Sequence, residues 1–136
     1  MESRRNTIAS QFVFVAGLML GMAALVQGTY ALWRVVVDMN QGQLPGDFIR
    51  SIAAVWVFSS MGMLLLAVWS FFISSQLAMG FRQAFFQGIA LGVSLLFFGL
   101  GAFLLLYPQG WQYFLFLVDG SLILCGVLFF FRTTPA

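Results

Sequence analysis

Four long apolar stretches, separated by short polar segments, dominate the pattern of the sequence. The stretches cover about residues 12–37, 49–75, 84–107 and 111–131. Each reaches the length of about 20 apolar residues that a helix needs to cross the hydrocarbon core of a bilayer. The pattern therefore predicts an all-α integral membrane protein with four transmembrane helices, in which residues 1–136 form a single membrane domain.

The polar segments predict how these helices are connected. Residues 38–48 (DMNQGQLPGDF) combine glycine, proline, asparagine and two acids, which together mark a loop. Residues 76–83 form a shorter connection, and Pro108-Gln109-Gly110 forms a tight turn. Short connections place consecutive helices side by side in opposite directions. We therefore expect an antiparallel four-transmembrane-helix bundle.

The composition supports this class of protein and argues against others. Hydrophobic residues make up 62% of the chain and charged residues 7%, with a mean hydropathy of +1.00, whereas soluble domains have about 25% charged residues. The sequence has no histidine and one cysteine, so the commonest metal ligand and general base is missing. No phosphate-binding loop, zinc spacing or nucleophile elbow occurs. We therefore expect no enzymatic activity, no cofactor and no bound metal.

The six arginines predict the orientation of the helices. The side of the two termini would carry Arg4, Arg5, Arg82 and Arg132, and the other side Arg34 and Arg50 with Asp38 and Asp47. The positive-inside rule then puts both termini in the cytoplasm, as for a protein of a bacterial inner membrane. The aromatic residues expected near the outer interface are Tyr30, Trp33, Tyr107, Trp111 and Tyr113. A net charge of +2 without a basic cluster does not predict nucleic-acid binding.

The N-terminus allows a second interpretation. Ser3-Arg4-Arg5 followed by an apolar run resembles a secretory or twin-arginine signal. The run is, however, longer than the apolar region of a signal peptide, and no convincing A-x-A cleavage site precedes Arg34. We therefore expect the first helix to be retained, with the two arginines as cytoplasmic anchors.

Small residues at helical spacing predict faces on which helices approach closely in lipid. The glycine pairs are Gly17 and Gly21 in the first helix and Gly88 and Gly92 in the third, and a weaker serine pair, Ser70 and Ser74, lies in the second. We expect these residues to pack the four helices against one another. The alternative is a dedicated dimerisation face in a homo-oligomer.

Asp119 is the one acidic or basic residue of the last two apolar stretches. A carboxyl at this depth needs a partner, a proton or water, so it is a candidate functional site. Counted inward from Trp111, Asp119 lies about 12 Å below the outer boundary of the bilayer. The same count, made from the outer end of each other helix, gives a similar depth for Gln27, Ser59, Ser60 and Gly99. We therefore predict an intramembrane polar site in which Asp119 hydrogen-bonds to one of the two serines or to Gln27.

Three roles are open for Asp119. The protonated carboxyl would donate a hydrogen bond across a helix interface, worth on the order of 1 kcal/mol. It could instead belong to a proton or cation path, or pair with a basic group of another membrane subunit. Because no other acid accompanies it in the membrane, we expect an accessory, assembly or stress-associated membrane protein. The alternative is a small oligomeric channel or a proton-coupled carrier that uses Asp119.

The last two helices resemble a known family. The run from Gly88 to Arg132, GIALGVSLLFFGLGAFLLLYPQGWQYFLFLVDGSLILCGVLFFFR, is similar to the glycine-punctuated helix hairpin of the HdeD-like acid-resistance membrane proteins. The matching positions are Gly92, Gly99, Pro108, Gly120 and Gly126. The resemblance covers about a third of the chain and implies a membrane hairpin, and no functional residue is carried over from it. The glycine pairs of the first and third helices also allow the two hairpins to be copies of one ancestral unit.

Overall fold

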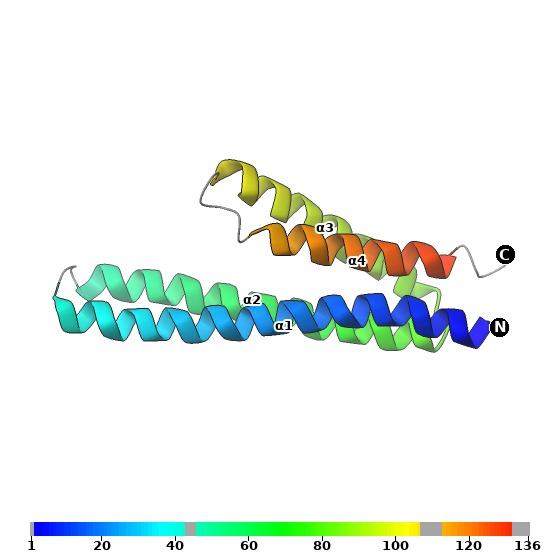
Figure 1. Ribbon diagram of the computed structural model, residues 1–136, viewed down its shortest axis with the longest axis horizontal. Helices are drawn as coiled ribbons and strands as arrows, with labels where there is room; N and C mark the ends of the chain where they lie inside the picture. Colours follow the sequence, from blue (N-terminus) through cyan, green and yellow to red (C-terminus); the bar gives the residue numbers. More distant parts are fainter. Residues whose placement is uncertain (1, 43–45, 107–112, 132–136) are drawn as a thin grey trace.

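The described part of the chain consists of four helices and contains no strand (Figure 1). The computed structural model describes residues 2–42, 46–106 and 113–131, except for the side chains of residues 2–5 and 38–40. The helices are α1 (Glu2–Gln41), α2 (Gly46–Ala78), α3 (Gln83–Leu105) and α4 (Phe114–Phe131). All four are long and apolar enough to cross a membrane, as the sequence predicted.

The first two helices are longer than the sequence analysis expected. α1 begins at Glu2 rather than near residue 12, and it continues to Gln41 through residues that were expected to form a loop. Neither glycine nor proline interrupts residues 29–41, so nothing stops the helix there. Gly42 ends it with a φ of +63°, a left-handed conformation that glycine adopts at low cost. Because α2 already begins at Gly46, the predicted loop over residues 38–48 was too long.

The later boundaries differ less from the expected ones. α2 continues to Ala78 rather than residue 75, and α3 ends at Leu105. The predicted end of the third helix at Tyr107, the proline turn and the predicted start of the fourth helix at Trp111 lie outside the described residues.

The connection between α2 and α3 is a glycine-terminated helix end. Gly80 has a φ of +82°, the Phe81 amide donates to the Gln76 carbonyl at 3.0 Å, and the Gly80 amide donates to the Leu77 carbonyl at 3.0 Å. This pair of bonds is the Schellman motif, which satisfies carbonyl groups that the end of a helix leaves free. The chain can therefore reverse within a few residues and begin α3 at Gln83.

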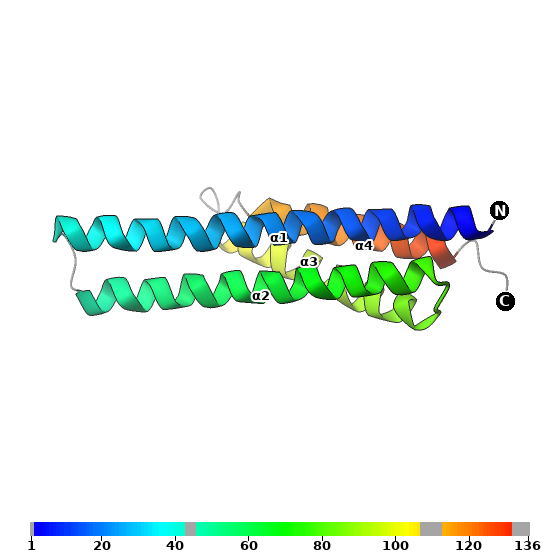
Figure 2. The ribbon, with the colours of Figure 1, turned by 90° about the horizontal axis from the view of Figure 1, so that it is seen from below.

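Side chains of α1 and α2 hold these two helices together along their length (Figure 2). The Ser74 hydroxyl donates to the Ser10 carbonyl at 2.9 Å, and the Ser60 hydroxyl donates to the Ala24 carbonyl at 2.5 Å. The contact further along α1 is therefore made by the residue earlier in α2, so the two helices run in opposite directions. Small residues permit this proximity: a Cβ placed on Gly17 would lie 3.1 Å from the Ser70 Cβ.

α3 and α4 approach each other closely enough for their backbones to touch. A Cβ placed on Gly120 would lie 2.8 Å from the Gly92 carbonyl oxygen and 3.0 Å from the Leu96 amide nitrogen. A Cβ on Gly99 would lie 3.0 Å from the Leu117 nitrogen. Any side chain at these glycines would collide with main-chain atoms, so glycine sets the distance between the two helices.

The two hairpins meet mainly where α4 packs against α1. A Cβ on Gly126 would lie 2.7 Å from the Ala9 carbonyl oxygen, and Gly88 of α3 lies against Val127 of α4 and Ile73 of α2. Around these contacts lies a buried apolar core from all four helices, which includes Val13, Leu20, Ile73, Leu77, Leu91, Ile123, Val127 and Phe130. The first helix is thus an integral part of the core.

The two hairpins differ in length. At 1.5 Å per residue, the 40 residues of α1 extend about 60 Å and the 18 residues of α4 about 27 Å. The shared core reaches along α1 as far as Ala24 and along α2 as far as Met63. Beyond it, residues 25–41 and 46–62 extend past α3 and α4 and are called the projecting hairpin (Figure 1). The remainder of the bundle, where four helices pack together, is called the four-helix half.

Candidate intramembrane polar site

Asp119 lies in the middle of α4 and has 0% of its surface exposed. It shares a face of the helix with Ile123, Gly126 and Phe130, which are buried as well. Gly126 packs on Ala9 of α1. Since Asp119 lies two helical turns before Gly126, it is directed at the interface with α1 and not at lipid. A lipid-facing carboxyl, which would have indicated a missing partner subunit, is not what the fold shows.

The level of Asp119 along the bundle follows from the same contacts. Gly126 meets α1 at Ala9 and Val13, and α1 and α4 have opposite directions (Figure 1). Seven residues, or about 10 Å, separate Gly126 from Asp119. Asp119 therefore lies at the level of residues 16–20 of α1, which include the small residues Ala16 and Gly17.

The hydrogen bonds predicted for Asp119 are not formed. Both of its carboxyl oxygens are buried and have no hydrogen-bond partner. The Ser60 hydroxyl instead donates to the Ala24 carbonyl, and the Gln27 amide donates to the Ser59 hydroxyl at 3.2 Å. The predicted polar site is thus divided: three of its members form a contact between α1 and α2, and Asp119 lies apart from them.

The reason for this error is the unequal length of the hairpins. Depth was counted inward from the outer end of each helix, as if all the ends were level. The outer ends of α1 and α2 in fact project beyond the start of α4 (Figure 1). Residues at the same distance from the outer ends of two helices therefore lie at different levels along the bundle. Gln27, Ser59 and Ser60 lie in the projecting hairpin.

Other buried polar groups lie nearer to Asp119 along the bundle. Ser70 has 0% of its surface exposed and donates to the Leu66 carbonyl of its own helix at 3.0 Å. Ser74 and Ser10 are buried one turn further toward the start of α1 and are joined by the Ser74 hydrogen bond. From the sequence, Ser70 and Ser74 were predicted to pack helices together and were not assigned to the polar site. Their spacing of four residues on an apolar helix was the signal that could have assigned them to a polar site.

Three side-chain amides follow at the end of the four-helix half. The Asn6 Oδ1, Gln76 Oε1 and Gln87 Oε1 atoms, from α1, α2 and α3, are buried and have no hydrogen-bond partner. Asn6 lies near the end of α2, since its Nδ2 atom would be 3.6 Å from a Cβ on Gly80. These amides are half-buried, and together with Asp119 they are the described side chains that have buried oxygen atoms without a partner.

The four glycines predicted to pack helices lie at interfaces within the chain. Gly17 lies against Ser70 and Phe71 of α2. A Cβ placed on Gly21 would lie 3.7 Å from the Ala67 Cβ, also of α2. In the other hairpin, Gly88 lies against Val127 of α4, and a Cβ on Gly92 would lie 2.8 Å from Leu124 Cγ.

Aromatic residues form a cluster in the projecting hairpin. The Tyr30 ring lies 5.9 Å from Trp33 and 6.2 Å from Trp56, measured between ring centroids. Tyr113 lies elsewhere, at the start of α4, where its ring packs 6.3 Å from that of Phe116. The aromatic residues expected at one interface therefore occupy two levels of the bundle, and Tyr107 and Trp111 lie outside the described residues.

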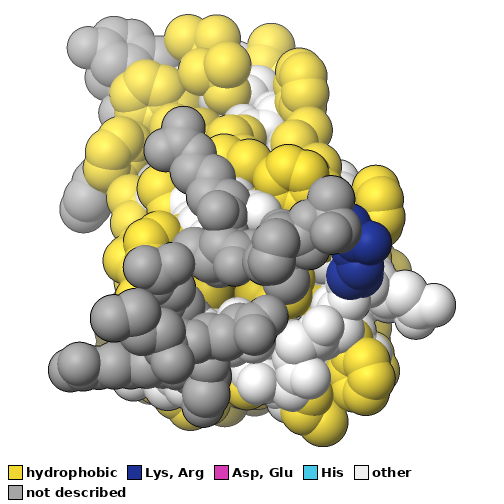
Figure 3. All heavy atoms as spheres, turned by 90° about the vertical axis from the view of Figure 1, so that its right-hand side faces the viewer, with side chains coloured by type: hydrophobic (Ala, Val, Ile, Leu, Met, Phe, Trp, Pro, Cys, Tyr) yellow, Lys and Arg dark blue, Asp and Glu magenta, His cyan; other side chains and the backbone are white. Residues whose placement is uncertain are grey.

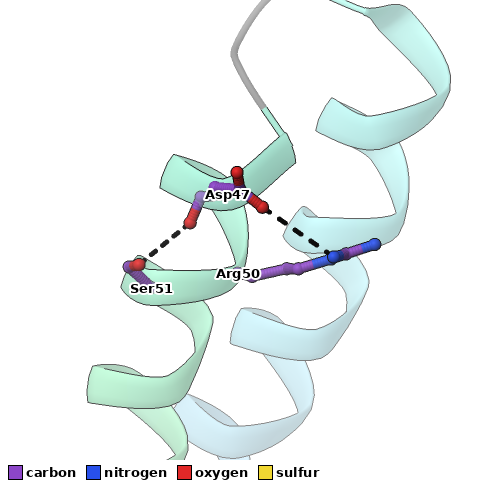
Figure 4. Close-up of polar contacts among 3 residues, drawn as sticks. All are labelled: Asp47, Arg50 and Ser51. Carbon is purple, nitrogen blue, oxygen red and sulfur yellow. Dashed lines mark hydrogen bonds and ion pairs between the residues drawn. The ribbon is translucent and has the colours of Figure 1, made fainter.

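The charged residues of the projecting hairpin lie near its tip. Arg50 and Asp47 form an ion pair at 3.9 Å, and the Ser51 hydroxyl donates to the Asp47 carbonyl at 2.9 Å (Figure 4). Both charged side chains are largely or fully exposed, so the pair adds little to stability. Arg34 lines a shallow pocket of about 190 Å³ with Trp56 and apolar neighbours.

The opposite end of the molecule carries a basic side chain among hydrophobic ones (Figure 3). Arg82, which precedes α3, borders a shallow pocket of about 330 Å³ whose other lining residues are Phe85, Phe86, Phe130 and Phe131. An arginine above aromatic rings is typical of a side chain whose charge reaches the membrane surface from an apolar base.

The chemistry available to these groups is limited to oxygen and amide donors and acceptors. Within residues 2–42, 46–106 and 113–131, no group of three or more histidine, cysteine, aspartate or glutamate side chains could hold a metal ion. Cys125 is free and exposed. Asp119 is the one acid of the four-helix half whose side chain is described, and it can bind or release a proton.

No protein-family model, curated protein or solved structure matches this chain. The resemblance of residues 88–132 to the HdeD-like proteins stays a prediction from the sequence.

Proposed function

We propose that the four helices cross a bacterial inner membrane in alternating directions, with both termini in the cytoplasm. Arg82 supports this orientation, because it lies at the end of the bundle where α1 begins and has no acid near it in the sequence. At the other end, Asp47 offsets Arg50. Arg132 and the side chains of Arg4 and Arg5, which carry most of the charge difference, lie outside the described residues.

Labelling of single cysteines tests this topology. In a Cys125→Ala background, a Gly42→Cys variant should react with a membrane-impermeant maleimide in intact cells, and a Gly80→Cys variant should react after lysis alone. Both glycines end helices with positive φ, so the two sites are matched. The reverse labelling pattern would place the termini outside.

For its molecular role, we propose a non-enzymatic accessory or assembly protein that binds another membrane protein through the projecting hairpin. The main support for this role is the apolar surface of the projecting hairpin. Its exposed hydrophobic residues include Leu25, Val26, Leu32, Trp33, Val36, Val55, Phe58 and Met61. An apolar surface of this kind needs lipid or protein around it.

The lengths of the helices favour protein contact over lipid alone. If α3 and α4 cross a hydrocarbon core of about 30 Å, the residues of α1 after Ala24 extend about 25 Å further. A tilt of at most about 40° shortens the apolar part of α1, Asn6–Val37, from about 48 Å to about 37 Å along the membrane normal, which still exceeds the core. Part of the apolar surface would then lie among head groups or beyond them, where a partner protein would cover it.

Photo-cross-linking at matched positions tests this role. Phe58 lies in the projecting hairpin and is 79% exposed, and Phe97 lies on α3 and is 74% exposed. A photoreactive phenylalanine at position 58 should capture a second membrane protein in cells, and the same residue at position 97 should capture lipid. Lipid adducts at both positions would contradict the proposal, and a dimer of this chain would identify a second copy as the partner.

One observation favours the alternative of a small channel or proton-coupled carrier. Asp119 is completely buried and neither of its oxygens has a partner, so an interhelical hydrogen bond does not account for it. A partner subunit could not reach it without opening the bundle. In liposomes, a carrier should show solute or proton movement that depends on a pH gradient and is lost in Asp119→Asn. Flux no greater than in empty liposomes would exclude this alternative.

A further inference from the structure

The unpaired buried oxygens lie together in one part of the bundle. Asn6 Oδ1, Gln76 Oε1, Gln87 Oε1 and both oxygens of Asp119 are in the four-helix half. The one described buried polar side chain of the projecting hairpin, Ser60, has a partner. Buried polar groups in proteins are almost always satisfied, by protein or by ordered water. Unpaired oxygens that belong to three helices at one end of a bundle therefore indicate a place where water enters.

Polar groups also connect this end with Asp119. Ser74 and Ser10 are joined by a hydrogen bond, and Asn6 lies one turn before Ser10 on α1. Ser70 lies one turn beyond Ser74 and packs against Gly17, which is at the level of Asp119. The polar row, defined as Asn6, Gln76, Gln87, Ser10, Ser74 and Ser70, thus leads from the start of α1 to the level of Asp119.

Beyond Asp119 the interior is apolar. Leu20 of α1, Met63 of α2, Leu95 of α3 and Phe116 of α4 are all buried near or beyond its level. The next buried polar group along α2 is Ser60, whose hydroxyl is engaged by the Ala24 carbonyl. The described polar side chains whose oxygens are buried and unpaired therefore lie at the level of Asp119 and on one side of it along the bundle.

We propose that Asp119 is a proton-binding site that exchanges with water from one side of the membrane, the side at which α1 begins, along the polar row. A hydronium ion at that end would give up a proton, the O–H bond would form on a carboxylate oxygen of Asp119, and water would remain. Loss of the proton follows the same path in reverse. The site requires no partner protein, and it can bind a proton without net transport, so it does not depend on the accessory role or on flux.

Apart from Glu2, Arg4 and Arg5, whose side chains lie outside the described part, no other ionisable side chain lies along this path. Tyr30 and Arg34 of α1, and Asp47 and Arg50 of α2, belong to the projecting hairpin. Arg82 precedes α3, which has no charged residue of its own. On α4, Tyr113 packs against Phe98 and Phe116, and Cys125 is exposed. Among the side chains that the structure describes, none is therefore a charged neighbour of Asp119 along the row.

Infrared spectroscopy of the protein in liposomes tests the proposal directly. A protonated carboxyl has a C=O stretch separate from the amide bands, and the Asp119→Asn variant should lack it. We expect this band to shift in D₂O and to lose intensity as the pH rises. An Asp119→Glu variant, which keeps the carboxyl, should retain a band and serves to separate the loss of the group from misfolding.

Variants of the row test its role as the path. Ser74→Val removes the hydroxyl one turn from Ser70, and we expect it to slow deuterium exchange of the Asp119 band roughly tenfold, equivalent to about 1.4 kcal/mol on the barrier. Ser75→Val is the matched control, because Ser75 is exposed and its hydroxyl donates to the Phe72 carbonyl. It should leave the rate unchanged.

Three results would overturn the proposal. The band could fail to exchange in D₂O, which would show a carboxyl closed to water. Exchange could proceed equally fast in Ser74→Val and in the control, which would exclude the row as the path. The band could respond to Na⁺ at constant pH, which would identify a metal cation as the ligand in place of the proton.

Discussion

The two hairpins of this protein hold their helices together in different ways. α1 and α2 contact each other through side chains, and serine hydroxyls at two levels donate to carbonyls of the opposite helix. α3 and α4 contact each other through their backbones at Gly92, Gly99 and Gly120. The comparison teaches that the residues at the interface set its character: serines let α1 and α2 form polar contacts, and glycines let α3 and α4 meet through their backbones.

The difference between main-chain and side-chain contact predicts the largest effect. In Gly120→Ala the new Cβ would meet the Gly92 oxygen and the Leu96 nitrogen, which belong to rigid helices and cannot move aside. We expect a loss of about 3 kcal/mol in the free energy of unfolding, measured by denaturant titration in detergent micelles. Gly101→Ala, where a Cβ meets nothing within 4 Å, is the control. Equal stability of the two variants would show that α3 and α4 are not packed at this distance.

The unpaired carboxyl between the hairpins predicts an effect of opposite sign. Asp119→Val replaces a buried group without partners by an apolar one, so the cost of burying the carboxyl disappears. We expect the thermal stability in detergent to rise, by about 2 kcal/mol in free energy. Ser121→Val, at an exposed position on the same helix, should change little. A clearly destabilised Asp119→Val protein would mean that Asp119 has a partner after all.

The α1–α2 interface should tolerate the same glycine change better. In Gly17→Ala the new Cβ would lie 2.9 Å from the edge of the Phe71 ring, and this half-buried ring can move. We expect a loss of about 1 kcal/mol by the same denaturant titration, well below that of Gly120→Ala. If Gly17→Ala proved as costly as Gly120→Ala, the distinction between the two hairpins would be wrong.

The smallest effect concerns the serine contacts of the longer hairpin. Ser60→Ala removes the hydroxyl that donates to the Ala24 carbonyl, and interhelical hydrogen bonds of this kind are worth about 0.6 kcal/mol. Ser51→Ala, which removes an exposed bond within α2, is the matched control and should be neutral. Paired thermal melts of the two variants measure the difference. No difference would show that side-chain hydrogen bonds do not hold α1 to α2.

Most of the architecture could be predicted because lipid imposes a simple condition. A backbone in the hydrocarbon must satisfy its own hydrogen bonds, so an apolar run of sufficient length forms a helix. The four runs were therefore found correctly, and Asp119 lies in the fourth of them, as predicted. The helix ends were predicted less well, because Asp38, Asn40 and Gln41 are polar but residues 38–41 contain no residue that stops a helix.

The candidate site was predicted less well than the helices. Asp119 was identified, since an acid in an apolar run is visible in any sequence. Its neighbours were not, because Gln27, Ser59 and Ser60 were chosen by depth. Ser70, Ser74 and Ser10 were missed as polar neighbours because a buried serine and a packing serine look the same in a sequence.

The sequence by itself determined the number of helices, their apolar character and the presence of one acid among them, since these follow from the cost of polar groups in lipid. The tertiary structure alone decided which residues share a level. That register depends on where Gly126 meets Ala9 and where Ser74 meets Ser10, contacts between residues far apart in the chain. Close packing at these few positions, and not distance from a helix end, sets the surroundings of Asp119.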